Sequence, residues 1–331
     1  MIPSHAVMIQ DFGAPESFPL VEQTLSAPGP GKLLLRILAA GVSFVDALVA
    51  AGKYQLKPPR PFIRGSECAG VILAVGEGVS LRPGQRVLAA GFGFAFAEAA
   101  IIPEKLAIPI PDEMGFVTAS VFRVSYATAY YALVQRAALQ PGETLLVLGA
   151  AGAVGQAAIE LGKIFGARVI ASASTPEKRE AALRAGADAA IDARAANWRT
   201  LVKDASGGKG VNVVLDTIGG ASTEPAFRSL AWGGRHLIIG FASGEIPKLP
   251  VNLALLKGAA LLGVDVRQFD LYQPAKAAQN IAALFRLYQE KKLHPAVAVK
   301  LPLARFAEAL NLASAGETAG RIVLEMGEPH K

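Results

Sequence analysis

The pattern of apolar and polar positions changes character along the chain. In residues 1 to about 124, short apolar runs alternate with turns such as APGPG at 27–31 and RPGQ at 82–85. Glycine and proline at this density mark turns and strand ends, and many short strands so spaced predict a small β-barrel. The strands expected in this part are 6–9, 33–38, 69–75 and 86–90.

After a helical stretch at 117–138, apolar strands alternate with helices. Runs such as VNVVLD at 211–216 are nearly all apolar, as expected for strands that are covered on both faces. Alternation of this kind predicts right-handed crossovers and a doubly wound parallel sheet, which gives an α/β fold class. The expected strands are 144–148, 168–172, 189–192, 211–216, 235–240 and 259–266.

The tail returns to short strands. A helix at 275–290 is followed by strands at 296–301 and 321–325 around a helix at 304–313. We read this tail as part of the first domain, so that the sheet domain is an insertion. The expected division is 1–124 with 267–331 for the barrel domain and 125–266 for the sheet domain.

A glycine-rich turn follows the strand at 144–148. The unpaired amides and the positive dipole end of the next helix attract a pyrophosphate, and glycines allow a close approach. Alone the motif is weak, because an unliganded turn of small residues has the same pattern. As the first turn of a doubly wound sheet it predicts a dinucleotide site. The predicted contacts are Gly149, Ala151, Gly152, Ala153, Val154 and Gly155.

The end of the second strand predicts which dinucleotide binds. An acidic residue there would select NAD, but the strand runs into ASAST and the first carboxylate is Glu177, inside the next helix. Ser174, Lys178 and Arg179 instead offer donors and positive charge for a 2′-phosphate. We therefore expect NADPH. The alternative is that Lys178 and Arg179 form a solvated helix face.

Composition excludes several partners. The net charge of +6 comes from 33 basic and 27 acidic residues without like-charge runs, which argues against nucleic acid. No uninterrupted apolar stretch reaches 18 residues, which argues against a membrane. The start lacks the pattern of a signal peptide, and Cys68 is the single cysteine, so we expect a cytoplasmic protein.

Eight short motifs, in order, cover nearly the whole chain. Their pattern resembles the zinc-independent quinone oxidoreductases of the medium-chain dehydrogenase/reductase superfamily. The resemblance implies a GroES-like barrel domain, a Rossmann domain and a homodimer joined through edge strands of the Rossmann sheets. The motifs are AGVSFVD at 40–46, GSECAGV at 65–71, LRPGQRV at 81–87, TAY at 128–130, GAAGAVG at 149–155, LDTIGG at 215–220, IGFASG at 239–244 and NLALLKG at 252–258.

At several positions the chain lacks residues that bind zinc or the cofactor phosphate in relatives. Zinc-dependent relatives carry Cys near Ala40 or Ser43 and His after Gly65, where this chain has Ser66. Without thiolate or imidazole ligands at these places, we expect no metal. In the family, an Asn-Tyr pair after the third strand supplies a Tyr contact to the 2′-phosphate, and this chain has Asp192-Ala193 there. An Arg that some members supply near residues 315–316 is absent.

The resemblance also suggests site residues. Tyr54 lies where related enoyl-thioester reductases place a proton donor, although a packed loop aromatic is an equal alternative. Ser43 stands where relatives carry Asn, and Thr128 matches a threonine near the nicotinamide. Asp46 is more simply a structural acceptor. Backbone contacts to the nicotinamide are expected from Gly240, Phe241, Ala242, Val264 and Val266.

These features predict an oxidoreductase that transfers hydride from NADPH to quinones or α,β-unsaturated carbonyls without a metal. One alternative is an enoyl-CoA or acryloyl-CoA reductase, with Lys53, Arg60 and Arg64 forming a basic entrance for CoA. Another is a non-catalytic NADPH-binding protein, like crystallin relatives. Three phenylalanines, Phe92, Phe94 and Phe96, alternate and are expected to share one face, as core or as lining of an apolar pocket.

Overall fold

The computed structural model describes residues 1–327, which form two compact units. One contains residues 1–124 and 297–327, and the other contains Ser125–Ala296. The expected boundary at residue 267 is wrong, because residues 267–296 group with the sheet unit. Their contacts explain this: Asn280 and Gln135 exchange hydrogen bonds of 2.8 and 3.2 Å, and Phe269 stacks on Tyr131 at 4.1 Å between ring centroids.

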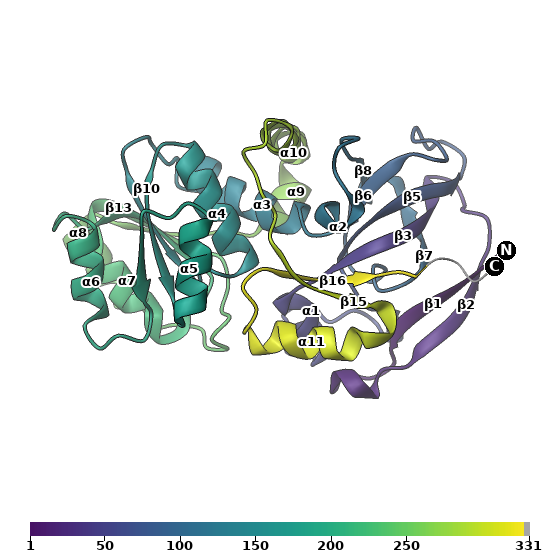
Figure 1. Cartoon of the computed structure of the whole chain (residues 1–331), viewed down its shortest axis with the longest axis horizontal. Helices are drawn as coiled ribbons and strands as arrows, with labels where there is room; N and C mark the ends of the chain where they lie inside the picture. The colour runs from purple at the N-terminus through teal and green to yellow at the C-terminus, as the bar shows by residue number, and fades with distance from the viewer. Residues whose placement is uncertain (328–331) are drawn as a thin grey trace. The chain divides into compact units, whose positions relative to one another are not determined.

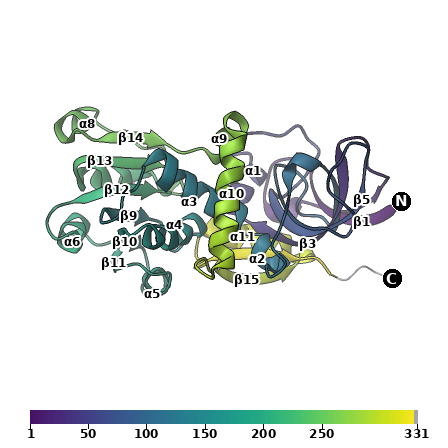
Figure 2. The same cartoon turned by 90° about the horizontal axis from the view of Figure 1, so that it is seen from above.

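A six-stranded parallel sheet organises the second unit, as predicted. The strand order is β11-β10-β9-β12-β13-β14, the doubly wound order that reverses beside β9. Figure 2 shows this order running from β14 at the top to β11 at the bottom. The strands are β9 (Thr144–Leu148), β10 (Arg168–Ala173), β11 (Ala189–Asp192), β12 (Val211–Asp216), β13 (Leu230–Ile238) and β14 (Ala260–Gly263).

Helices cover both faces of this sheet (Figure 1). The helices α4 (Ala153–Ile164) and α5 (Pro176–Arg184) lie on one face. The helices α6 (Trp198–Ala205), α7 (Thr223–Arg228) and α8 (Asn252–Lys257) lie on the other. This two-sided cover explains why the central strands β9 and β12 are almost entirely apolar and buried.

Several element ends differ from the expectation for local reasons. The sixth strand stops at Gly263 because the Asp265 side chain accepts from the Arg267 and Gln268 amides and starts α9 (Val266–Tyr272). The helical stretch at 117–138 is divided into α2 (Phe116–Ala119), α3 (Arg123–Tyr130) and a π-helical turn at Tyr131–Arg136. The long helix α10 spans Pro274–Gln289.

The first unit is built from two sheets, and the tail completes one of them. In the larger sheet the order is β15-β16-β3-β5-β6-β8, and β7 also pairs with β3. The smaller sheet has the order β2-β1-β4. The strands are β1 (Ile2–Ile9), β2 (Leu20–Leu25), β3 (Lys32–Val42), β4 (Phe62–Ile63), β5 (Glu67–Val75), β6 (Arg86–Ala90), β7 (Ala99–Pro103), β8 (Ala107–Pro109), β15 (Val297–Pro302) and β16 (Arg321–Glu325).

Apolar side chains from both sheets form the core of this unit, together with α1 (Phe44–Ala50) and α11 (Phe306–Ala315). Phe94 and Phe96 belong to that core, whereas Phe92 is 40% exposed. The three phenylalanines therefore do not share one face, because residues 91–96 form bends rather than a strand. None of the helices within residues 1–327 has both the length and the apolar character that a bilayer crossing needs.

Candidate functional site

The carboxyl ends of five parallel strands form one row across the second unit. Ser172 pairs with Leu148, Leu148 with Asp216, Asp216 with Ile238 and Ile238 with Gly263. The turns after these strands therefore emerge at one edge of the sheet, which is where doubly wound domains bind ligands. This edge brings together the predicted cofactor residues of the second unit.

The glycine turn packs tightly against its neighbours. A Cβ at Gly149, whose φ is 67°, would lie 2.4 Å from Thr217 Oγ1. A Cβ at Gly155 would lie 2.4 Å from the Gly149 carbonyl oxygen. Both positions therefore need glycine for the turn itself to form.

The middle glycine of the turn, Gly152, leaves space at the start of α4. Gly152 is the N-cap, its φ of −73° and ψ of 167° suit any residue, and no side chain caps the helix. An ideal Cβ at Gly152 would meet only the Gly149 carbonyl, at 3.2 Å. The first turn, which includes Ala153, Val154 and Gly155, contains no acidic residue. The unpaired amides at this helix start, the positive end of the helix dipole and the lack of an acidic side chain all suit the binding of a pyrophosphate.

A buried aspartate fixes the neighbouring turn. Asp216 accepts hydrogen bonds from the amides of Ile218 (2.9 Å) and Gly219 (2.8 Å) and from the Thr223 hydroxyl (2.8 Å). His236 Nε2 lies 3.1 Å from Asp216 Oδ2. Burial alone would raise the pKa of Asp216, but these donors, His236 first, hold that pKa below its ordinary value.

The Asp216 turn is tied to the glycine turn by a neighbouring residue. Thr217 Oγ1 donates to the Leu148 carbonyl at 3.0 Å. From the sequence, this stretch is recognised only as a family motif, with no predicted role at the site. The available signal was an aspartate and two glycines, LDTIGG, directly after an apolar strand.

The end of β10 carries the residues expected near the 2′-phosphate. Ser174 and Lys178 are half-buried, and the Thr175 side chain caps α5 by accepting from the Lys178 amide. Arg179 Nη1 lies 3.4 Å from both the Ala173 carbonyl and Asp192 Oδ1. Arg179 is thus held at the strand end by the carboxylate of the next strand rather than lying free on a solvated face.

The remaining predicted contacts lie in the turns after β13 and β14. Gly240, Phe241 and Ala242 follow β13, and the Ala242 amide donates to the Thr217 carbonyl at 3.1 Å. Val264 is buried after β14, and Val266 opens α9. The side chains at these positions are small or apolar, so polar contacts from this part of the edge come from the backbone.

In the first unit, Ser43 belongs to a hydrogen-bonded cluster around Asp46. Ser43 caps α1, and its hydroxyl and amide donate to Asp46 Oδ2 at 2.5 and 2.8 Å. Ser66 Oγ donates to Asp46 Oδ1 at 3.1 Å, and Arg64 Nη2 lies 2.6 Å from the same oxygen. The side chains of Arg64 and Asp46 are fully buried. Asp46 is therefore a structural acceptor, as expected.

This cluster does not fit a zinc ion. Ser43 and Ser66 offer hydroxyls that already donate to Asp46, and zinc is bound by thiolate, imidazole or carboxylate groups. Glu67 accepts from the Val124 amide at 2.9 Å and pairs with Arg321 at 3.0 Å. Across residues 1–327, no three side chains of His, Cys, Asp or Glu are grouped to hold a metal.

The basic entrance considered for CoA is not formed as expected. Arg64 is fully buried, so it cannot line an entrance, and burial lowers the pKa of its guanidinium while Asp46 opposes that shift. Arg60 pairs with Asp11 and lies over the Phe12 ring at 5.0 Å. Of the three basic residues, only Lys53 is exposed without such a contact.

The two other predicted catalytic residues have different surroundings. Tyr54 is half-buried in the irregular segment 53–61, and its ring centroid lies 6.5 Å from that of Phe92. Thr128 is buried on α3. Its neighbours on this helix pack as expected, because the Tyr126 hydroxyl donates to Glu160 at 2.7 Å and Tyr130 meets the edge of Phe165 at 5.8 Å.

Two family models match the chain. Residues 29–112 match the alcohol dehydrogenase GroES-like domain, and residues 153–283 match the zinc-binding dehydrogenase domain. These matches fall in the first and second units, respectively. The first unit is thus GroES-like and the second is Rossmann-type.

Full-length relatives agree with the domain matches. The chain is 35% identical to quinone oxidoreductase-like protein 2 of Rattus norvegicus, covering 90% of this chain and 86% of the relative. It is 29% identical to quinone oxidoreductase of Homo sapiens, covering 96% and 97%. A mycobacterial protein solved in complex with NADPH is 30% identical, with coverage of 97% and 99% and a TM-score of 0.90.

Proposed function

The chain belongs to the quinone oxidoreductase type of the medium-chain dehydrogenase/reductase superfamily, and on this premise we propose that it reduces quinones or α,β-unsaturated carbonyls with NADPH. The observation that carries the proposal is the row of strand ends in the second unit, with an acid-free glycine turn at its centre. NADPH in the mycobacterial structure neighbour supports the choice of cofactor.

Each turn of this edge has a role. The amides at the start of α4 hold the pyrophosphate, and Asp216 positions the turn that packs against Gly149. Backbone groups of Gly240, Phe241, Ala242, Val264 and Val266 orient the nicotinamide end. When bound, NADPH supplies the hydride. The protein contributes binding, orientation and a proton for the substrate oxygen.

The protein prefers NADPH to NADH through Ser174, Lys178 and Arg179. The β10 end has no acid of its own, and the Asp192 carboxylate beside it is paired with Arg179. The repulsion that an acidic residue would exert on a 2′-phosphate is thereby reduced, while Lys178 adds a positive charge.

Neutralising the two cations in Lys178→Gln/Arg179→Gln is expected to weaken NADPH binding about tenfold to 100-fold, because charge-assisted hydrogen bonds to the 2′-phosphate are lost. NADH lacks that phosphate and serves as the internal control. Fluorescence titration of both cofactors measures the change. A parallel loss for NADH and NADPH would show that these residues do not read the phosphate.

Tyr54 donates the proton in this proposal, on the strength of its place in the family pattern and its half-buried loop. Tyr54→Phe is expected to reduce kcat with a quinone or an enone about 100-fold, because general-acid catalysis is lost. The dissociation constant for NADPH should stay the same. Tyr272→Phe, at a tyrosine that is 76% exposed, is the control for removing a hydroxyl. Unchanged turnover in Tyr54→Phe would exclude Tyr54 as the donor.

We also propose that the chain forms a homodimer through β14, the edge strand of its Rossmann sheet. Large apolar side chains are exposed on and beside this edge: Trp232 at 85%, Val251 at 85%, Leu255 at 82%, Leu256 at 71% and Leu261 at 48%. An exposed strand edge with an apolar surround is a surface that proteins usually cover.

Leu255→Asp/Leu256→Asp is expected to convert the dimer into a monomer, because two charges would be buried at the contact. Light scattering should then give the single-chain mass of 34.4 kDa instead of twice that value. Leu183→Asp, at a 46% exposed leucine on α5, is the matched control and should remain dimeric. A monomeric wild-type protein at micromolar concentration would refute the dimer.

Two further parts of the proposal concern metal and compartment. The reaction proceeds without zinc, because Ser43 and Ser66 replace the ligands of zinc-dependent relatives and already donate to Asp46. The protein acts in the cytoplasm on a small molecule, with no nucleic acid or membrane partner in the reaction. The single thiol, Cys68, is fully buried, and burial raises its pKa, so it takes no part in the chemistry.

A further inference from the structure

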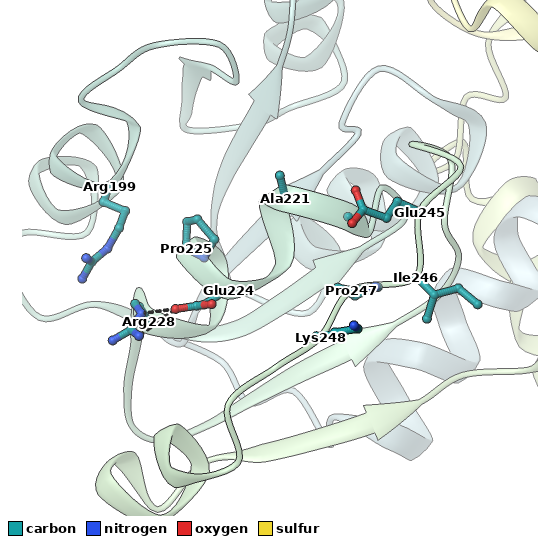
Figure 3. Close-up of a pocket in the computed structure, with 10 residues that line it drawn as sticks. Arg199, Ala221, Glu224, Pro225, Arg228, Glu245, Ile246, Pro247 and Lys248 are labelled. Carbon is teal, nitrogen blue, oxygen red and sulfur yellow. Dashed lines mark hydrogen bonds and ion pairs between the residues drawn. The ribbon is translucent and has the colours of Figure 1, made fainter.

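Two adjoining hollows lie on the face of the second unit that α6, α7 and α8 cover. The larger, of about 620 Å³, is lined by Ala221, Pro225, Ile246 and Pro247 among others (Figure 3). The smaller, of about 250 Å³, is lined by residues of α6, α7, α8 and the loop 207–210. Arg199 and Arg228 line both hollows, so the two lie next to each other.

The smaller hollow is strongly basic. Five cationic side chains line it, and no acidic side chain does. Of the five, only Arg228 pairs with a carboxylate within residues 1–327, that of Glu224 in the larger hollow, at 2.6 Å. Figure 3 shows this contact as a dashed line, with Arg199 on the same side of the view. The five cations are Arg199, Lys203, Lys209, Arg228 and Lys257.

Two of these cations are held in place. Glu224 orients the guanidinium of Arg228, and Lys257 Nζ donates to the Leu230 carbonyl at 2.6 Å. Burial lowers the pKa of Lys257, and the positive charges of Arg199 and Arg228 lower it further. The cations therefore repel one another, and an anion placed between them would relieve that repulsion.

The basic hollow is separate from the edge that carries the glycine turn. Gly210 directly precedes β12, Leu230 is the first residue of β13, and Lys257 ends the helix before β14. These residues lie at the amino ends of the strands. The glycine turn follows the carboxyl end of β9, so the dinucleotide site and the basic hollow are at opposite ends of the sheet. The larger hollow extends toward the other end, because Gly220 and Glu245, which line it, lie in loops after the carboxyl ends of β12 and β13.

We propose that the basic hollow is a second binding site, for a small molecule that carries two or more phosphate groups. Guanidinium forks and ammonium groups are the usual partners of phosphate oxygens, and the four cations that do not pair with a carboxylate in the described part of the chain match a ligand with three or four negative charges. The larger hollow accommodates the organic part of that ligand, because its lining mixes apolar side chains, such as Pro225, Ile246 and Pro247, with charged ones, including Glu224, Glu245 and Lys248. This site goes beyond the proposed reductase reaction.

The test uses the full-length chain with NADPH at saturation and inorganic pyrophosphate as the probe, measured by calorimetry. The wild-type protein is expected to bind pyrophosphate, and Lys203→Gln/Lys209→Gln should weaken that binding at least about 30-fold. Both lysines are exposed and make no side-chain hydrogen bond or ion pair within residues 1–327, so the fold should persist. Arg199→Gln is a second variant with the same expected direction.

The control is Lys32→Gln/Lys276→Gln, which removes two exposed lysines elsewhere and should leave pyrophosphate binding unchanged. Equal binding in the test and control variants would overturn the proposal, as would binding that disappears when NADPH is added. Binding of a single-stranded oligonucleotide without any binding of pyrophosphate would also overturn it. Unchanged affinity for NADPH in all variants separates this result from a failure of the cofactor site.

Discussion

Replacing Asp46 with alanine is expected to lower the free energy of unfolding by about 3–5 kcal/mol. The carboxylate lies beside Arg64 in the interior of the first unit, and both side chains are fully buried. Without Asp46, the Arg64 guanidinium would keep its positive charge with no counter-ion. The hydroxyls of Ser43 and Ser66 would lose their acceptor as well.

The loss of stability in Asp46→Ala comes mainly from leaving the Arg64 charge buried without a counter-ion, and less from the attraction between Arg64 and Asp46. Asp46→Ala/Arg64→Met removes both charges and should therefore be less destabilised than Asp46→Ala. Chemical denaturation of the wild-type protein, the two single variants Asp46→Ala and Arg64→Met and the double variant gives the coupling free energy between Asp46 and Arg64. Asp11→Asn is the matched control: Asp11 is 86% exposed and pairs with Arg60, so its loss should cost about 0–1 kcal/mol. An equal loss of unfolding free energy in Asp46→Ala and Asp11→Asn would contradict a buried ion pair between Asp46 and Arg64.

Replacing Gly152 with valine is expected to weaken NADPH binding about 100-fold, roughly 2.7 kcal/mol. The new side chain would stand at the start of α4, where the pyrophosphate meets open amides. Its Cβ would meet only the Gly149 carbonyl at 3.2 Å, and the backbone angles suit valine. The fold should therefore survive the change.

A second glycine provides the control for this substitution. Gly115 is the N-cap of α2, with a φ of −68° and a ψ of 152°, and nothing lies within 4 Å of its ideal Cβ. Gly115→Val should therefore have a similar effect on stability and none on cofactor affinity. Fluorescence titration and thermal unfolding of both variants separate the two effects. Full NADPH affinity in a folded Gly152→Val protein would place the pyrophosphate elsewhere.

The fold of the second unit could be predicted because its signals are local. Apolar runs such as 211–216 and the turn at Gly149–Gly155 are contiguous in sequence, and the parallel register then brings their ends into one row. The GroES-like unit is predicted from the family motifs. The proposed cofactor site at the carboxyl edge follows from topology, so the sequence is enough to propose its residues.

Other features could not be predicted because they depend on pairs that are distant in sequence. Asp46 and Arg64 are 18 residues apart, and nothing in the sequence around either residue indicates that both are buried and paired. The sequence places Arg179 either at the 2′-phosphate or on a solvated helix face, and it does not indicate that Asp192 of the next strand holds this side chain. The sequence places residues 267–296 in the barrel domain, but α10 packs in the second unit, and this partner is visible only in contacts such as Asn280 with Gln135.

The most direct test of the central claim is the oxidation of NADPH by the purified wild-type chain, followed by its absorbance in the presence of a quinone or an enone. The account predicts turnover with at least one of these acceptors, and a lower kcat/KM when NADH replaces NADPH. Adding a zinc chelator should leave the rate unchanged. Absence of NADPH oxidation with either acceptor, despite NADPH binding, would contradict the proposed reductase function.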